Sequence, residues 1–196
     1  MNPELPTCHA GGLPLAYWPI QKLLILESIN FFKMDKYIRY SAYAGIASLV
    51  LSILGPFIVP YLIFALASLA AGAETYGFYR IGAKEKLKLL KTISLILIVM
   101  SLIYFVLFLF SPEYVFSVEN LILSGIVAII FAASLQPLMK KFKTLVKAVI
   151  FFSYATGFLM AIGWLFSPII LIASFLTIVL GVLEIIFLYK ASSKYK

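Results

Sequence analysis

Six long apolar segments, separated by short polar or basic junctions, constrain the fold of this chain more than any other feature. Each is close to the ~20 residues that cross the hydrocarbon core of a bilayer at about 1.5 Å of rise per residue. Because backbone amides in lipid must be hydrogen-bonded within their own segment, such segments are expected to be helical. We therefore predict an all-α integral membrane protein with six transmembrane helices, at residues 37–54, 57–79, 92–110, 119–139, 144–166 and 169–189.

The composition agrees with a membrane protein. Of the 196 residues, 63% are hydrophobic and 12% are charged, whereas soluble domains have about 25% charged residues. The net charge of +8 would suggest nucleic acid as the partner of a soluble protein. Here the 16 Lys and Arg residues lie in the N-terminal segment, two loops and the C-terminus, and no nucleic-acid motif is present. The lipid bilayer is therefore the expected partner, and nucleic acid is not.

The distribution of basic residues predicts the topology. Basic residues border the junctions at 80–91 and 140–147 and occur near both ends, whereas the turns near 55–57, 111–118 and 166–168 contain no Lys or Arg. Under the positive-inside rule, basic junctions face the cytoplasm. We therefore expect three helical hairpins in the cell membrane, with the N- and C-termini both cytoplasmic.

The first 33 residues differ in character from the rest of the chain. Residues 1–19 are rich in proline and glycine and are expected to be an irregular tail. Residues 20–33 place apolar residues at helical spacing among polar ones, which suits a short amphipathic helix on the membrane surface. A second interpretation stays open, because Met34 begins a basic run that resembles a natural start. The six-helix bundle is assigned to residues 34–196.

The chain lacks the residue types that most cofactor and metal sites need. Cys8 is the only cysteine and adjoins His9, the only histidine, so an internal disulfide is excluded and the pair is too small to complete a tetrahedral metal site. No phosphate-binding loop, nucleophile elbow or metalloprotease motif is present. No metal, cofactor or catalytic residue is therefore predicted, and the protein is not expected to be an enzyme.

A period of 56 residues runs through the turns. Pro56, Pro112 and Pro168 recur at this spacing, and the sequence Leu-Phe-Ser-Pro at 109–112 returns at 165–168. This period predicts a parallel internal repeat of three hairpins. Short loops between six helices would give a similar period without a duplication, so both interpretations stay open.

Two carboxylates, Glu74 and Glu184, lie inside predicted helices, and such residues are costly in a membrane and therefore functional candidates. Counting outward from Pro56 places Arg39 at the depth of Glu74. Glu74 is therefore expected to be a structural ion-pair partner, and Glu184 is the better candidate for binding a proton or a ligand.

Four further polar residues are expected near these carboxylates. Counting outward from Pro168 places residues 152–154 at the depth of Glu184, with no cation among them. The helix at 119–139 adds a hydroxyl and an amide near the same membrane boundary. Helix–helix hydrogen bonds are the alternative role for such groups. The predicted intramembrane polar cluster consists of Glu184, Glu74, Arg39, Ser153, Tyr154, Ser134 and Gln136.

Small residues recur at four-residue spacing on three helices, and such ridges allow helix backbones to approach closely in lipid. They predict close helix packing and a homo- or hetero-oligomer joined through these faces. The ridges are Ser41 and Gly45 together with Ala44, Ser48 and Ser52, then Ser124, Ala128 and Ala132, and finally Ser153, Gly157 and Ala161.

In composition and topology, residues 34–196 resemble multi-pass membrane proteins of archaeal type, which are rich in Ile, Leu, Tyr and Lys and have short loops. No motif carries this resemblance, so it assigns no functional residue. We expect a non-catalytic protein, either an accessory or scaffold subunit or an orphan bundle, because intramembrane polar groups are few. The alternative is a small ion or solute carrier or channel that uses Glu184 and Glu74.

Overall fold

The computed structural model describes residues 35–115, 117–165 and 167–195. The expected tail, the amphipathic helix at 20–33 and the alternative start at Met34 lie outside the described residues. Within the described part the chain is almost entirely helical and contains no strand, which confirms the all-α prediction there. The α-helices are α2 (Lys36–Leu54), α3 (Pro60–Lys84), α4 (Lys88–Phe110), α5 (Val118–Leu135), α6 (Met139–Ile162) and α7 (Ser167–Lys194).

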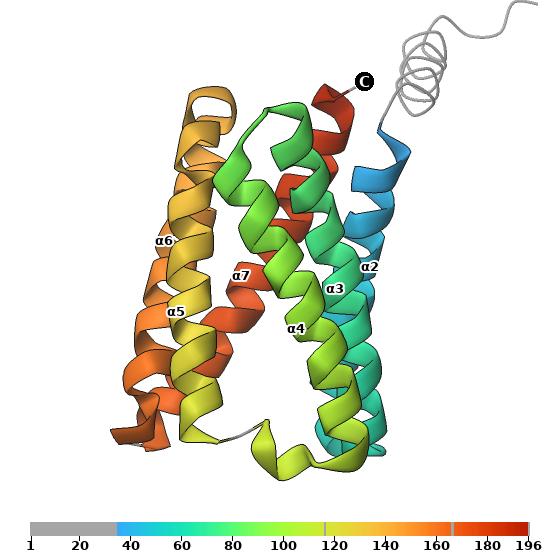
Figure 1. Cartoon of the computed structure of the whole chain (residues 1–196), viewed down its shortest axis with the longest axis vertical. Coiled ribbons are helices and arrows are strands. Elements are labelled where there is room, and N and C mark those ends of the chain that lie inside the picture. Colours follow the sequence, from blue (N-terminus) through green and yellow to red (C-terminus); the bar gives the residue numbers. More distant parts are fainter. Residues whose placement is uncertain (1–34, 116, 166, 196) are drawn as a thin grey trace, which may run out of the picture.

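Short 3-10 helices fill most of the connections, namely η1 (Gly55–Phe57), η2 (Pro112–Tyr114), η3 (Gln136–Leu138) and η4 (Gly163–Leu165). Five stretches are long and apolar enough to cross a membrane, and one of them, Val118–Ile162, takes in α5, η3 and α6 together. Figure 1 shows that this stretch folds back on itself, with α5 and α6 side by side.

Local chemistry explains where several helices begin. Asp35 is the N-cap of α2, and its carboxylate accepts hydrogen bonds from the amides of Tyr37 at 3.0 Å and Ile38 at 3.2 Å. Ser117 caps α5 through the amide of Asn120. Pro60 opens α3 at the first helical position, where its fixed φ suits a helix and its missing N–H costs nothing. Polar caps and proline thus mark the starts of three helices.

The helices extend further than predicted where the chain is basic. α3 continues to Lys84 rather than to residue 79, α4 begins at Lys88 rather than at 92, and α7 continues to Lys194 rather than to 189. Lys, Arg and Glu are good helix formers, so the helices continue past the apolar segments. The apolar segments therefore underestimate the helix lengths at this end of the molecule.

Both ends of the described chain lie at one end of the bundle (Figure 1). The turns between α3 and α4 and between α5 and α6 lie there too, while the other three turns lie at the opposite end. We call the first the basic end and define it by residues 35, 80–91, 139–143 and 190–195. The amide of Asp35 donates to the carbonyl of Ser192 at 3.0 Å, which fixes the start of α2 against the end of α7.

Helices α2 to α7 form a ring that is loosest between α4 and α5. Packing is extensive between successive helices elsewhere, and α7 runs between α6 and α2 to close the ring. Figure 1 shows α4 and α5 close together at the basic end and diverging toward the turn at 111–117. Of the three predicted hairpins, the middle one is therefore open, whereas the first and last are tightly packed.

Small residues of the predicted ridges pack inside the chain. A Cβ added at Gly157 would lie 2.7 Å from the carbonyl oxygen of Gly125, so α5 and α6 meet backbone to backbone. A Cβ added at Gly77 would lie 2.8 Å from the Cβ of Ser41, which brings α2 and α3 together in the same way. These ridge positions serve packing within one chain.

Candidate functional site

The two carboxylates that the sequence places inside apolar helices, Glu74 and Glu184, come from different helices and line the same cavities inside the helix ring. Glu74 comes from the middle of α3 and is 8% exposed, and Glu184 comes from α7 with intermediate burial. Both side chains line the same two cavities, and their carboxyl groups are near enough to interact electrostatically. We call Glu74 and Glu184 the carboxyl pair.

Two cavities meet at the carboxyl pair. Cavity A has a volume of about 240 Å³ and lies between α4 and α5, with α3, α6 and α7 completing its wall. Cavity B has a volume of about 220 Å³ and lies between α2 and α7, with α3 behind. Four residues line both cavities, namely Ala71, Glu74, Leu180 and Glu184. The carboxyl pair therefore stands at the partition between two separate spaces.

Unsatisfied polar atoms face these spaces. Oε1 of Glu74 and Oγ of Ser153 are buried and have no hydrogen-bond partner within the described part of the chain. Ser153 is fully buried and lines cavity A beside the carboxyl pair. Buried polar groups are nearly always hydrogen-bonded in native proteins. Two such atoms around one cavity leave hydrogen-bonding capacity that a bound ion, solute or water could use.

Room for the Glu74 carboxyl group comes from a glycine. A Cβ added at Gly45 would lie 2.6 Å from Oε1 of Glu74 and 2.8 Å from Cγ1 of Ile185. Any other residue at this position of α2 would displace the carboxyl group or push α2 away from α7. Gly45 is thus the third residue of the site, beside Glu74 and Glu184.

Aromatic side chains close the side of the carboxyl pair that faces the basic end. Phe78 packs against Phe131 with ring centroids 5.0 Å apart and against Phe187 at 5.6 Å. Phe187 in turn packs against Phe142 at 5.1 Å. Phe78 is 2% exposed and Phe187 is 1% exposed. This aromatic layer lies between the carboxyl pair and the basic end.

Both cavities extend the other way, toward the opposite end of the bundle. The part of cavity B on α2 runs from Gly45 to Ser52, two residues before the last residue of that helix. Cavity A reaches Tyr104 on α4 and Ser124 on α5, whose hydroxyl groups are hydrogen-bonded at 3.0 Å. The lining of both cavities thus extends from the carboxyl pair toward the end of the bundle opposite the basic end, with the aromatic layer on the other side of the pair.

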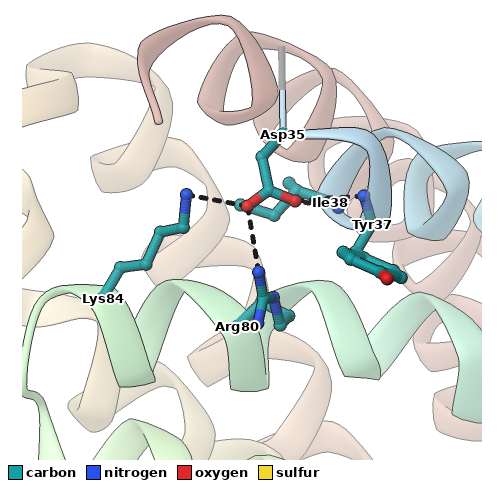
Figure 2. Close-up of polar contacts among 5 residues, drawn as sticks. All are labelled: Asp35, Tyr37, Ile38, Arg80 and Lys84. Atoms are coloured by element: carbon teal, nitrogen blue, oxygen red, sulfur yellow. Dashed lines mark hydrogen bonds and ion pairs between the residues drawn. The ribbon is translucent and has the colours of Figure 1, made fainter. Parts of the chain in front are cut away.

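A second group of acids lies at the basic end, beyond the aromatic layer. The Asp35 carboxylate contacts Nζ of Lys84 at 2.7 Å and a guanidinium nitrogen of Arg80 at 3.3 Å, as Figure 2 shows. Lys141 contacts Glu85 at 2.5 Å, joining the turn after α3 to the start of α6. We call these five residues the clasp.

Both acids of the clasp are stabilised as carboxylates. Burial would raise the pKa of Asp35, but a hydrogen bond from Lys84, the Ile38 amide and the charges of Lys84 and Arg80 hold this pKa below its ordinary value. Burial likewise opposes ionisation of Glu85. Hydrogen bonding from Lys141 and the charges of Lys141 and Lys194 bring the pKa of Glu85 below its ordinary value. Asp35 and Glu85 are therefore ionised at neutral pH.

The structure brings together three of the seven residues grouped by sequence. Glu74, Glu184 and Ser153 line cavity A. Gln136 instead donates to the Tyr154 hydroxyl group at 3.2 Å in an exposed position. The Ser134 hydroxyl donates to the carbonyl of Phe131 at 2.6 Å and lies beside the turn at 86–90. These last three residues make local hydrogen bonds outside the two cavities.

Arg39 is not level with Glu74, contrary to the count around Pro56. Glu74 lies opposite Gly45, six residues further along α2 than Arg39, which is about 9 Å at the α-helical rise. The cause is the connection between α2 and α3, because α3 begins only at Pro60 and the extra residues shift its register. Within the described residues, the charged group that interacts with the Glu74 carboxyl group is Glu184.

Sequence reasoning missed Asp35 and overlooked the role of Gly45 beside Glu74. Asp35 could have been found, because an Asp immediately before an apolar helix is a strong N-cap signal. Gly45 was noted as a ridge residue, but its contact with Glu74 depends on a register that the sequence does not reveal. Comparison of the chain with protein-family models, curated proteins and solved structures found no match in any of the three.

A metal site is not supported among the described residues. Within 35–115, 117–165 and 167–195, no group of three or more His, Cys, Asp or Glu side chains is placed to hold a metal ion. The carboxyl pair offers two acidic groups in a largely apolar setting. Such a pair can bind a proton or a monovalent cation, because one negative charge shared by two carboxyl groups is neutralised by one positive charge.

Proposed function

We propose that this protein is a small membrane carrier that binds a cation, the proton included, at Glu74 and Glu184. The observation that supports this most is the meeting of two cavities at an unpaired carboxylate oxygen deep inside an apolar helix ring. Intramembrane carboxylates lining a cavity commonly mark ion or substrate pathways. The sequence favoured an accessory subunit because a polar path was not evident, and the two cavities weaken that objection.

The proposed topology has six membrane-spanning helices, α2 to α7, with the basic end in the cytoplasm. In this orientation both cavities open toward the outside, and the aromatic layer and the clasp close the cytoplasmic side. A carrier alternates between states open to opposite sides around one site. The present arrangement corresponds to the state that is closed toward the cytoplasm.

Opening toward the cytoplasm would separate the clasp. Asp35 begins α2, Arg80 and Lys84 end α3, and Lys141 begins α6, so the ion pairs join three helices at one boundary. The loose contact between α4 and α5 divides the ring into α2–α4 and α5–α7. Rocking of these two halves about the α2–α7 contact would expose the carboxyl pair to alternate sides.

Proteoliposomes containing a trapped pH-sensitive dye provide the test. The inside of the vesicles is made more acidic than the outside, so that the proton gradient is directed outward. Na⁺, K⁺, tetramethylammonium or benzyltrimethylammonium is then added outside, and the internal pH is followed. We expect at least one cation to accelerate internal alkalinisation. The double variant Glu74→Gln/Glu184→Gln should lower that rate by at least about tenfold, equivalent to about 1.4 kcal/mol.

The matched control is Glu119→Gln, which removes an exposed acid from the first turn of α5 and should leave the rate unchanged. Equal rates for the wild type and the double variant with every cation would overturn the carrier proposal. Co-purification of a larger complex in mild detergent would then favour the accessory subunit expected from the sequence, assembled through faces other than the occupied ridge positions.

A further inference from the structure

The chemistry of cavity A suits a molecule with a large apolar body. Its wall is formed mainly by apolar side chains, with Phe78, Leu97 and Met100 on one side and Val127 and Phe131 on the other. Its volume of about 240 Å³ is far larger than a dehydrated alkali ion needs. Ligand pockets for organic molecules are likewise apolar, with a few placed polar groups.

Besides Thr75 and Ser101, whose hydroxyl groups donate to carbonyls of their own helices, two sets of polar groups line cavity A at its two ends. The carboxyl pair and the unpaired Ser153 hydroxyl lie at one end, while the hydrogen-bonded Tyr104 and Ser124 hydroxyls lie at the other. A carboxylate beside aromatic faces attracts an organic cation twice, by charge and by the cation–π interaction. An inorganic ion would use the carboxyl pair but leave the apolar wall unfilled.

Cavity B has a different lining. Its wall carries small and hydroxyl-bearing residues, including Gly45, Gly181, Ser48, Ser52 and Thr177, and no aromatic side chain. Leu49, Ile178 and Leu180 make much of the remaining wall apolar, but the hydroxyl groups and the carboxyl pair can supply the two or more polar partners that a water needs. Cavity B therefore offers a hydrated approach for protons to the same carboxyl pair.

We infer that the substrate is a monovalent organic cation with an aromatic or aliphatic body, held in cavity A and exchanged for a proton that travels through cavity B. This inference rests on the proposed function and names its substrate class. Charge balances in the exchange, because the cation binds the carboxylate as the carboxyl proton leaves. Since both ions need the same carboxyl pair, binding of one excludes the other, which couples the two movements.

The groups that titrate around the site are few. Among the described residues, the ionisable side chains lining the two cavities are Glu74 on α3, Glu184 on α7 and Tyr104 on α4. The parts of α2, α5 and α6 that line the cavities contribute no ionisable side chain. A pH dependence of cation binding therefore reports on the carboxyl pair, with Tyr104 as the one further ionisable group among the described residues that lines cavity A.

Calorimetric titration of the full chain in uncharged detergent tests the inference with three probes. Benzyltrimethylammonium has both features, tetramethylammonium lacks the aromatic body, and benzyl alcohol lacks the charge. We expect benzyltrimethylammonium to bind at least about tenfold more tightly than either of the others. Its affinity should fall by up to about tenfold for each unit of pH lowered through the titration of the pair, because binding releases one proton.

The expected loss of affinity in Glu74→Gln/Glu184→Gln supports the assignment, with Glu119→Gln as the unchanged control. If the double variant fails to fold, the pH dependence of the wild type alone decides. Equal affinity for benzyltrimethylammonium and tetramethylammonium, or affinity independent of pH, would sink the inference. Flux driven by Na⁺ or K⁺ without benzyltrimethylammonium binding would leave the carrier standing and reject this substrate class. Binding of benzyltrimethylammonium with proton release but without flux would support this substrate class and reject the carrier proposal.

Discussion

The molecule holds two pairs of acids, and they differ in what compensates them. Asp35 and Glu85 in the clasp each contact lysine, and Asp35 contacts an arginine as well. Glu74 and Glu184 have each other as neighbours and an unpaired oxygen between two cavities. A carboxylate that is paired with a cation contributes to the stability of the fold. A buried carboxylate without a cation lowers that stability, so its presence in a folded protein points to another role. The comparison thus separates an acid that holds helices together from one that binds something.

The largest effect on stability is expected at Asp35. In Asp35→Ala, α2 loses its N-cap and Arg80 and Lys84 lose the carboxylate they share, so we expect a destabilisation of about 2 to 3 kcal/mol. Asp35→Asn keeps a cap acceptor but not the charge, and should cost roughly half as much. Thermal unfolding in mild detergent, followed by circular dichroism, measures both. A destabilisation of Asp35→Ala no greater than that of Asp35→Asn would show that the cap contributes nothing.

A change of opposite sign is expected at the carboxyl pair. Glu74→Gln/Glu184→Gln removes two acidic groups that line largely apolar cavities, so the same unfolding measurement should show unchanged or higher stability, by up to about 1 kcal/mol. A clear destabilisation would place these residues with Asp35 as structural acids. The comparison between the two regions would then fail, whatever the flux experiments gave.

Much of the difference between the clasp and the carboxyl pair cannot be predicted from the sequence, for a physical reason. The apolar segments and basic junctions predict helices and their order, because each depends on nearby residues, and the all-helical fold is confirmed within the described residues. The meeting of Glu74 with Glu184 depends instead on α7 packing against α2, far apart in the chain, and on three extra residues before Pro60. A shift of a few residues along one helix replaced Arg39 by Gly45 as the group opposite Glu74.

The clasp illustrates the same limit at shorter range. The N-cap signal of Asp35 is local and readable, but its contacts with Arg80 and Lys84 cross 45 or more residues. Loops rich in lysine predict a cytoplasmic face without indicating which lysine meets which acid. Glu85 and Lys141 stand 56 residues apart, the spacing of the proposed repeat, yet the packing of the helices does not follow three equal hairpins.

The smallest expected effect is a pH dependence of folding stability, which distinguishes the clasp from the carboxyl pair. Because the pKa of folded Asp35 lies below its ordinary value of 3.8, the ionised carboxylate stabilises the fold above about pH 4, and this contribution disappears as pH falls through the folded pKa. The wild type should therefore exceed Asp35→Asn in stability at neutral pH by about 1 kcal/mol, and the two should converge in acid. Glu85→Gln should show the same convergence from a smaller difference, below about 1 kcal/mol, because Lys141 is 46% exposed.

The carboxyl-pair variant is the control for this acid titration. Unlike Asp35→Asn, it should not be less stable than the wild type at neutral pH and regain that difference in acid, because no cation among the described residues shifts the titration of the pair. A gap between the wild type and Asp35→Asn that persists unchanged in acid would mean that the Asn side chain, rather than the lost charge, causes the difference. The ion pairs of Asp35 with Lys84 and Arg80 would then contribute nothing to holding α2 against α3, and the acids of the clasp would no longer differ from the carboxyl pair in being compensated.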